Sequence, residues 1–237
     1  MTPEHARHPG GGFNPPEPTT KGGPDYGRFI DAVRALQDHA RAVDAPDEVI
    51  SEAADLIEKV SELLTPFDTD EWRSPSGRRM DLPNRGNILA VPMKVSKTPD
   101  GRIRGWARFR RFHLGRNGAV HGGEIAHLFD SVLGMTSAVL TGGPYQRTAY
   151  LHLNYRHIVP IEKELQVDAG VSRVDGRKIF VEGRLCERRH GVDRRRGAVR
   201  APQTRPAVSR FGCQELRRRD RGAADNHSGL VVRRDEG

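Results

Sequence analysis

The hydrophobic positions in the first third of the chain recur with a helical period. Phe29, Ile30, Val33 and Leu36 are spaced as on one face of a helix. A second segment begins after Pro46, with acidic residues in its first turn. We predict two helices within Tyr26–Phe67 that pack on a domain or on each other. The second has the apolar face Val49, Ile50, Ala53, Leu56, Ile57, Val60, Leu63 and Leu64.

Beyond residue 87 the apolar positions take the period of strands, and one glycine-opened helix interrupts them at roughly 122–141. The turns Pro99-Asp100-Gly101 and Asp175-Gly176 join neighbouring strands. Two strands, a central helix and a three-strand meander indicate an α+β domain with an antiparallel sheet. The predicted strands are Ile88–Val95, Ile103–Phe112, Arg147–His157, Leu165–Val174 and Lys178–Cys186.

The segments around these elements divide the chain further. Residues 1–25 are rich in Pro and Gly and read as a disordered arm, and 68–85 read as a loop before a domain at 86–187. The N-terminus lacks the apolar region of a secretory signal, and no apolar run approaches a membrane span. Cys186 and Cys213 provide neither a disulfide framework nor metal-ligand spacing. We therefore expect a cytoplasmic protein.

The net charge of +8 at first suggests a nucleic-acid partner. However, residues 188–237 hold 14 arginines, no lysine and six acidic residues, so this segment accounts for the whole excess. The predicted domain therefore has no electrostatic reason to bind nucleic acid. We expect the Arg-rich tail to be disordered and to supply no strand, because it cannot bury enough apolar surface.

The tail also has an unusual coding property. Residues 192–208 can be encoded so that the +1 frame reads LTAAEGLFVRLKPGQP, which alternates like a strand and ends in a Pro-Gly turn. We interpret this as a departure from the ancestral reading frame near residues 188–191. The alternative is a genuine basic interaction tail.

The central helix combines an apolar core face with a carboxylate. Asp130 shares a helical stripe with Ala126 and Gly134, whose small side chains allow close approach. Gly122 and Gly123 open the helix, so their N–H groups lie at the positive end of the helix dipole. Such donors can hold an oxyanion, and the carboxylate is a candidate general base or nucleophile. The alternative is a helix-face aspartate in solvent.

The spacing along this helix predicts a dimer. His121 and Asp130 are nine residues apart, about 13 Å along a helix axis. One carbonyl group cannot contact both positions on the same helix. In a two-fold dimer with antiparallel helices, the glycines of one subunit would lie beside Asp130 of the other. We therefore expect an active site shared between subunits.

The segment NGAVHGGEIAHLFDSVLG, followed by RTAYLHLNYRHIVPI and VSRVDGRKIFVEGRL, resembles the hotdog-fold thioesterases of the phenylacetate-degradation (PaaI-like) group. It is also similar to thioesterase superfamily members four and five. The resemblance covers roughly residues 86–187. It implies a sheet wrapped around one long helix, catalytic homodimers that could pair as dimers of dimers, and hydrolysis of acyl-CoA thioesters, with medium- to long-chain fatty acyl groups as candidates. It implies no metal or redox cofactor.

The resemblance assigns roles to single residues. Asp130 corresponds to the catalytic acid, Gly122 to the oxyanion donor and His121 to the motif histidine, with Gly123 beside them. Thr148 falls where some members carry a hydroxyl near the attacking water. Where some members have an asparagine, this chain has Gly115, and Asn117 lies two residues later. The family's final strand is missing from the chain as written.

Other residues are weaker candidates. Tyr155 could line the acyl pocket, and basic residues at or near strand ends could bind coenzyme A phosphates. Alternatives to hydrolysis are a hotdog hydratase and a non-catalytic acyl-CoA-binding protein or frameshift-inactivated thioesterase. The pair Glu124 and His127 has the spacing of half of a di-iron motif, which is a weaker alternative to the hydrolase site. The candidate phosphate ligands are Arg156, Arg173, Arg177 and Lys178.

Overall fold

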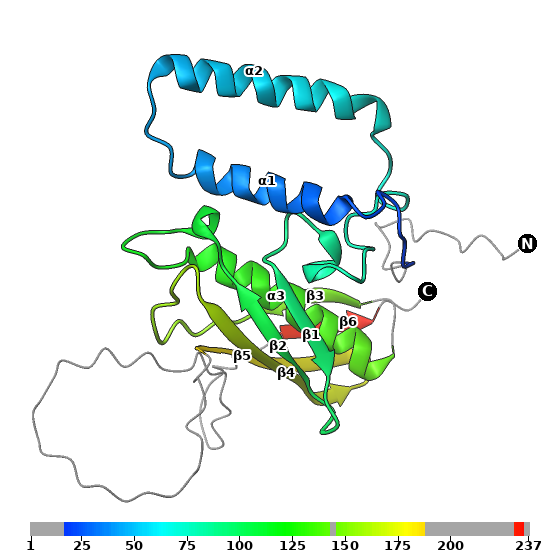
Figure 1. Ribbon diagram of the computed structural model, residues 1–237. Coiled ribbons are helices and arrows are strands. Elements are labelled where there is room, and N and C mark those ends of the chain that lie inside the picture. Colours follow the sequence, from blue (N-terminus) through cyan, green and yellow to red (C-terminus); the bar gives the residue numbers. More distant parts are fainter. Residues whose placement is uncertain (1–16, 143–145, 188–229, 235–237) are drawn as a thin grey trace, which may run out of the picture.

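A computed structural model describes residues 17–142, 146–187 and 230–234. An antiparallel sheet packs against a long helix, α3 (Gly122–Thr141), and two further helices, α1 (Tyr26–Ala40) and α2 (Asp47–Leu64), lie outside this domain (Figure 1). Three short 3-10 turns connect these elements: η1 (Thr65–Phe67), η2 (Pro83–Gly86) and η3 (Arg111–His113). The strands are β1 (Met93–Lys97), β2 (Ile103–Arg108), β3 (Gln146–Leu151), β4 (Glu164–Asp175), β5 (Lys178–Glu187) and β6 (Leu230–Arg234).

Helix α3 provides the centre of the core, as its apolar pattern predicts. It begins after the N-cap His121 and ends at Gly142, whose left-handed backbone (φ 67°) terminates the helix. Its predicted inward face is buried against alternate residues of the sheet, which confirms the prediction. The face consists of Ile125, Leu128, Phe129, Val132 and Leu133.

Several strands are shorter than predicted. β1 starts at Met93 rather than Ile88, because Pro92 lacks the N–H that a paired strand residue would donate. β2 ends at Arg108, and the turn η3 follows where the strand was expected to continue. β3 ends at Leu151 rather than His157. The two strands around the Asp175-Gly176 turn match the prediction within one residue at each end.

The strand order is β1-β2-β4-β5-β6-β3, which corrects two predictions. The predicted meander is wrong for β3, because β3 pairs with β6 and not with β4. The prediction that the tail supplies no strand is also wrong, since Leu230–Arg234 lies between β5 and β3. This short segment begins with three apolar residues, and both neighbours offer it hydrogen bonds. Residues 192–208, for which the +1 reading frame predicts a strand, lie outside the described residues.

The prediction of a disordered arm over residues 1–25 is wrong where the structure describes it. The amide of Thr19 donates to the carbonyl of Arg78 at 3.1 Å. The guanidinium of Arg78 donates to the carbonyl of Glu17 at 2.7 Å. The guanidinium of Arg79, which is buried, donates to the carbonyls of Lys21 and Gly23. Residues 17–25 are therefore fixed on the loop that precedes β1.

Helix α1 packs on the domain through polar contacts. The Asp38 carboxylate accepts hydrogen bonds from the Arg110 side chain at 2.7 Å and from the Phe112 amide at 2.9 Å. Arg34, which is buried, donates to the carbonyl of Asn87 at 3.0 Å. Together with the buried side chain of Ile30, these contacts attach one face of α1 to η3 and to the segment before β1.

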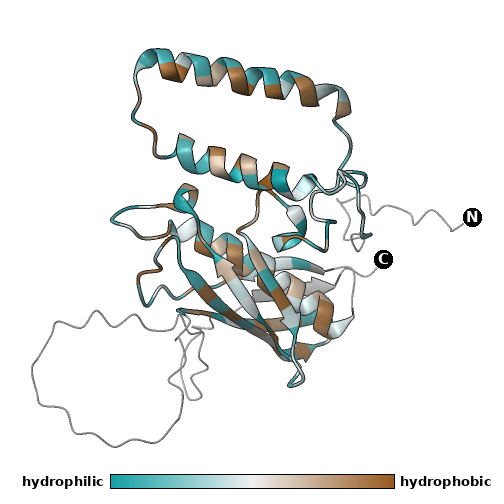
Figure 2. Cartoon of the chain, in the orientation of Figure 1, coloured by the Kyte–Doolittle hydropathy of each residue, from teal (hydrophilic) through white to brown (hydrophobic). Residues whose placement is uncertain are grey.

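Helix α2 begins after Pro46 with Asp47 and Glu48 in its first turn, as predicted, but none of its residues is buried. Hydrophobic (brown) and hydrophilic (teal) residues alternate along α2, the outermost helix in Figure 2. The expectation that both helices pack on a domain or on each other is therefore wrong for α2. A helical period identifies the apolar face but does not identify the surface that covers it.

Candidate active site

A short loop positions the start of α3. The amide of Val120 donates to the carbonyl of Val159 at 2.8 Å, and the amide of His121 donates to the carbonyl of His113 at 2.9 Å. At the tip of this loop, Asn117 (φ 52°) and Gly118 (φ 75°) adopt left-handed backbone conformations, as a tight turn requires. Asn117 thus has a structural explanation as a turn residue.

His121 caps the helix with its side chain. Its Nδ1 accepts a hydrogen bond from the Gly123 amide at 3.1 Å, so in a neutral ring the proton is on Nε2. The Gly122 amide donates to no acceptor among the described residues. It is therefore an available donor in the first turn, where the helix dipole favours negative charge.

Tyr155 lies against this same turn. Its hydroxyl donates to the carbonyl of Gly122 at 2.9 Å. A Cβ atom at position 122 would lie 3.6 Å from Cε1 of the Tyr155 ring, an ordinary contact distance. The structure therefore brings together Gly122, Tyr155, His121 and Gly123 at the N-terminus of α3.

Asp130 and Thr148 form the second part of the site. The Thr148 hydroxyl donates to Oδ1 of Asp130 at 2.8 Å, which joins α3 to the neighbouring strand β3. Both residues are exposed in the single chain. The hydrogen bond fixes one carboxylate oxygen and leaves Oδ2 available to a water molecule or a substrate.

The two parts of the site are separate within one chain. Gly122 and Asp130 are eight residues apart on the same helix, about 12 Å along its axis. A carbonyl group held by the Gly122 amide is therefore out of reach of the Asp130 carboxylate of the same chain. The sequence predicts a shared site from nearly the same spacing, that between His121 and Asp130.

Within one chain, Arg177 and Lys178 lie far from the Gly122 part of the site. They lie nearer its other part, because Lys178 is in register through β6 with Arg147, the neighbour of Thr148 on β3. Arg177 and Lys178 are exposed at the turn between β4 and β5. β4 starts near the N-terminus of α3, and the turn lies at its other end, eleven residues away or about 36 Å along a strand. The Arg173 guanidinium stacks over the Phe180 ring at 3.9 Å from the centroid and pairs with Asp175. Arg156 is exposed beyond β3.

His113 is a supporting residue that sequence reasoning missed. It is buried, its Nδ1 accepts the Arg110 amide at 2.9 Å, and its carbonyl accepts the His121 amide. Burial lowers the pKa of its imidazole. The sequence signal was weak, because a lone histidine after a predicted strand is usually exposed.

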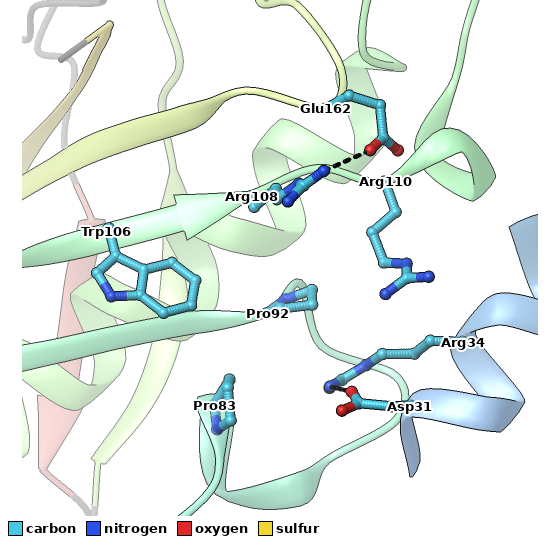
Figure 3. Close-up of a pocket in the computed structure, with 8 residues that line it drawn as sticks. All are labelled: Asp31, Arg34, Pro83, Pro92, Trp106, Arg108, Arg110 and Glu162. Carbon is cyan, nitrogen blue, oxygen red and sulfur yellow. Dashed lines mark hydrogen bonds and ion pairs between the residues drawn. The ribbon is translucent and has the colours of Figure 1, made fainter. Parts of the chain in front are cut away.

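A cavity of about 260 Å³ lies on the opposite face of the sheet (Figure 3). Trp106 and Arg108 point into it, whereas Ala107 between them is in the core. Its charged groups are paired, Arg108 with Glu162 at 2.8 Å and Arg34 with Asp31 at 3.8 Å. The cavity is therefore distinct from the candidate active site. A third lining residue, Arg110, pairs with Asp38 of α1 at 2.7 Å, and this ion pair joins α1 to the domain.

The described residues lack the features of two other classes of protein. No helix among them is long and apolar enough to cross a membrane. They contain no group of three or more His, Cys, Asp or Glu residues placed to hold a metal ion, and the Glu124–His127 pair stands alone, with its atoms 4.0 Å apart.

Part of this chain is similar in sequence to known thioesterases. Residues 117–192 match the model of the thioesterase superfamily. A stretch of 66 residues is 36% identical to acyl-coenzyme A thioesterase THEM4 of Xenopus laevis and covers 28% of this chain and 29% of that protein, so the chain matches less than a third of its relative.

Two solved structures are similar to this chain. A thioesterase superfamily protein has a TM-score of 0.62 at 23% identity over 92% of this chain and 93% of its own, which confirms the hotdog fold. Zebrafish thioesterase superfamily member 2 has a TM-score of 0.42 at 16% identity and covers 68% of this chain and 88% of its own.

Proposed function

Because the chain carries a hotdog domain of the thioesterase superfamily, we propose that it hydrolyses acyl-CoA thioesters to a free acid and coenzyme A. The observation that carries the proposal is the hydrogen bond from Thr148 to Asp130 on the exposed side of α3. The similarity to an acyl-coenzyme A thioesterase supports the substrate class. Medium- to long-chain fatty acyl groups are the substrates to test first.

The reaction needs a base and a site for the oxyanion. With Thr148 holding one oxygen, the Asp130 carboxylate takes a proton from water as the water oxygen attacks the thioester carbonyl carbon. The carbonyl oxygen becomes an oxyanion that accepts the Gly122 N–H at the helix N-terminus. Collapse breaks the C–S bond, and the departing thiolate takes the proton from Asp130. In the alternative, Asp130 attacks the carbon itself and the C–S bond breaks, so that coenzyme A leaves as its thiolate. Water then hydrolyses the resulting anhydride to the free acid and the Asp130 carboxylate, and the proton that it loses neutralises the thiolate.

The active unit in this proposal is a two-fold dimer in which Gly122 of one copy faces Asp130 of the other. The single chain offers the surface for it. A methyl group at Gly134, one turn beyond Asp130, would meet no atom of the described residues within 4 Å. β3 is an edge strand of the sheet, and Thr148 and Tyr150 are exposed on it. A second copy can cover both elements through the same patch.

The ligand-binding residues follow from the same arrangement. Tyr155 packs beside Gly122 and its ring lines the approach to the carbonyl. In an antiparallel pair of α3 helices, the β4–β5 turn of one copy comes to the end of the other copy that holds Gly122. Arg177 and Lys178 would then bind coenzyme A phosphates across the dimer.

The test is thiol release from an acyl-CoA series running from acetyl to stearoyl. Asp130→Asn keeps the shape of the side chain and removes the base, so turnover should fall roughly 10²–10⁴-fold. Asp44→Asn, at an exposed loop position, is the matched control and should leave turnover unchanged. Full activity of Asp130→Asn would exclude the catalytic role. A wild-type protein that binds acyl-CoA and releases no thiol would favour the non-catalytic alternative.

A further inference from the structure

The exposed face of α2 is the largest feature that the proposed function leaves unexplained. Among the described elements, only the adjoining turn η1 makes more than marginal contact with α2. One stripe along it, continued by Phe67, consists of large apolar side chains that are 41–78% exposed. The stripe comprises Val49, Ile50, Leu56, Ile57, Val60, Leu63, Leu64 and Phe67.

Helix α1 carries a second apolar stripe. Its docking face holds Ile30 and Arg34, and beside this face Phe29 and Leu36 are 38% and 42% exposed, followed by Val43 at 52%. Figure 1 shows α2 on the side of α1 that faces away from the sheet. The two stripes do not cover each other within the described structure. Within the described structure, the hairpin therefore presents two uncovered apolar surfaces, a long one on α2 and a shorter one that runs from α1 to Val43, just beyond the end of that helix.

The size of these surfaces fits an interface between proteins. The α2 stripe exposes roughly 600 Å², at the upper limit for apolar patches on monomers. If the α1 and α2 stripes of both copies are covered, the contact buries about 1,600 Å² in total, which is the size of a standard specific interface.

The charge of α2 limits which kind of partner can cover its apolar stripe. Helix α2 carries six acidic residues and one lysine, a net charge of −5. This composition opposes binding to anionic membranes, which select helices rich in Lys and Arg. It also disfavours two α2 helices side by side, because their charges repel each other. Helix α1 has two arginines and two aspartates and no net charge, so α2 meets no repulsion there.

We propose that the α1–α2 hairpin is a self-association surface, in which the apolar stripe of α2 packs on the Phe29–Leu36–Val43 stripe of α1 in a second copy. A two-fold axis makes the contact reciprocal, and the two hairpins form a four-helix bundle. This interface uses none of Gly122, Asp130 or Thr148, so it is independent of the proposed hydrolase site.

Photo-cross-linking of the full chain tests the pairing directly. A benzophenone amino acid replaces Leu56, and unlabelled and ¹⁵N-labelled proteins are mixed and allowed to exchange before irradiation. We expect cross-links from position 56 to the peptide that contains residues 29–43, with one light and one heavy partner. The same amino acid at Glu58, on the opposite face, should give none. Three results would each overturn the proposal. They are cross-links only between residues of the same isotope, cross-links to α2 of the other copy, and no cross-links at all.

A measurement of association provides the second readout. Ile57→Gln combined with Val60→Gln removes apolar surface that is 44% and 51% exposed in the single chain. Helical content and thermal unfolding at high dilution should match the wild type, whereas the dissociation constant of the hairpin contact should rise at least about 100-fold. Glu58→Gln with Glu62→Gln is the matched control and should associate at least as tightly as the wild type. Unchanged association of the apolar variant, by sedimentation equilibrium, would refute the interface.

Discussion

Gly122→Pro removes one candidate hydrogen-bond donor with little change elsewhere. Position 122 is the first residue of α3, where proline is favoured in helices. The preceding residue, His121, has φ −61° and ψ 134°, the extended conformation that a following proline requires. The lost N–H makes no hydrogen bond within the described residues. Gly122→Ala is the matched control, because its Cβ meets the Tyr155 ring at 3.6 Å and the N–H remains.

The expected effect is large on catalysis and small on stability. Loss of one oxyanion donor costs about 10²–10³-fold in turnover. The free energy of unfolding should stay within about 1 kcal/mol of the wild type, because no described hydrogen bond is lost and proline restricts the unfolded chain. Gly122→Ala should retain most of its activity. The assay is thiol release at saturating acyl-CoA, with urea unfolding of all three proteins.

Mixing the variants tests whether the site is shared. If Gly122 of one copy works with Asp130 of the other, a dimer of one Gly122→Pro and one Asp130→Asn subunit has one intact site. Random exchange of equal amounts yields about half mixed dimers, so activity should recover to about a quarter of the wild type. Mixed dimers confirmed by mass without recovery would place the site within one chain. Wild-type turnover by Gly122→Pro alone would refute the oxyanion role.

Two further predictions follow from single contacts. Thr148→Val removes the hydroxyl that donates to Asp130 at 2.8 Å, so turnover should fall roughly 10–100-fold. Thr148→Ser should retain it, and equal turnover of the Val and Ser variants would contradict the contact. Burial lowers the pKa of His113 in the folded protein, so as pH falls below about 6.5 the unfolded state binds the proton first and stability declines. In urea unfolding between pH 7 and pH 5, His113→Asn should show a smaller decline than the wild type, and an identical decline would exclude this origin.

The helices and the sheet class could be predicted because each is encoded in local periodicity. The bounds of α3 follow from the Gly122-Gly123 start and the Gly142 end, and its inward face follows from a 3.6-residue repeat. Strand order could not be predicted in this way. β6 pairs with β5 and β3, although it lies far from both along the chain. Its five residues are too few to change the average composition of the Arg-rich tail, so composition alone did not reveal this strand.

Within the candidate site, the sequence indicated the chemical groups, and the structure decided which of them meet. Asp130 and the glycine-opened helix stood out from residue types alone. The contact of Thr148 with Asp130 and that of Tyr155 with Gly122 depend on how β3 and the segment after it lie beside α3. Neither contact is visible in the order of residues, since the partners are 18 and 33 positions apart.

By itself, the sequence determined where α2 and α3 start, which helix faces are apolar, and that one helix holds a candidate base and a candidate oxyanion donor too far apart to act on one carbonyl group. Only the tertiary structure decided that α1 packs on the domain while α2 stays uncovered, and that a tail segment completes the sheet. The reason is physical. Periodicity is set by backbone geometry over neighbouring residues, whereas burial depends on which distant surface arrives to exclude water.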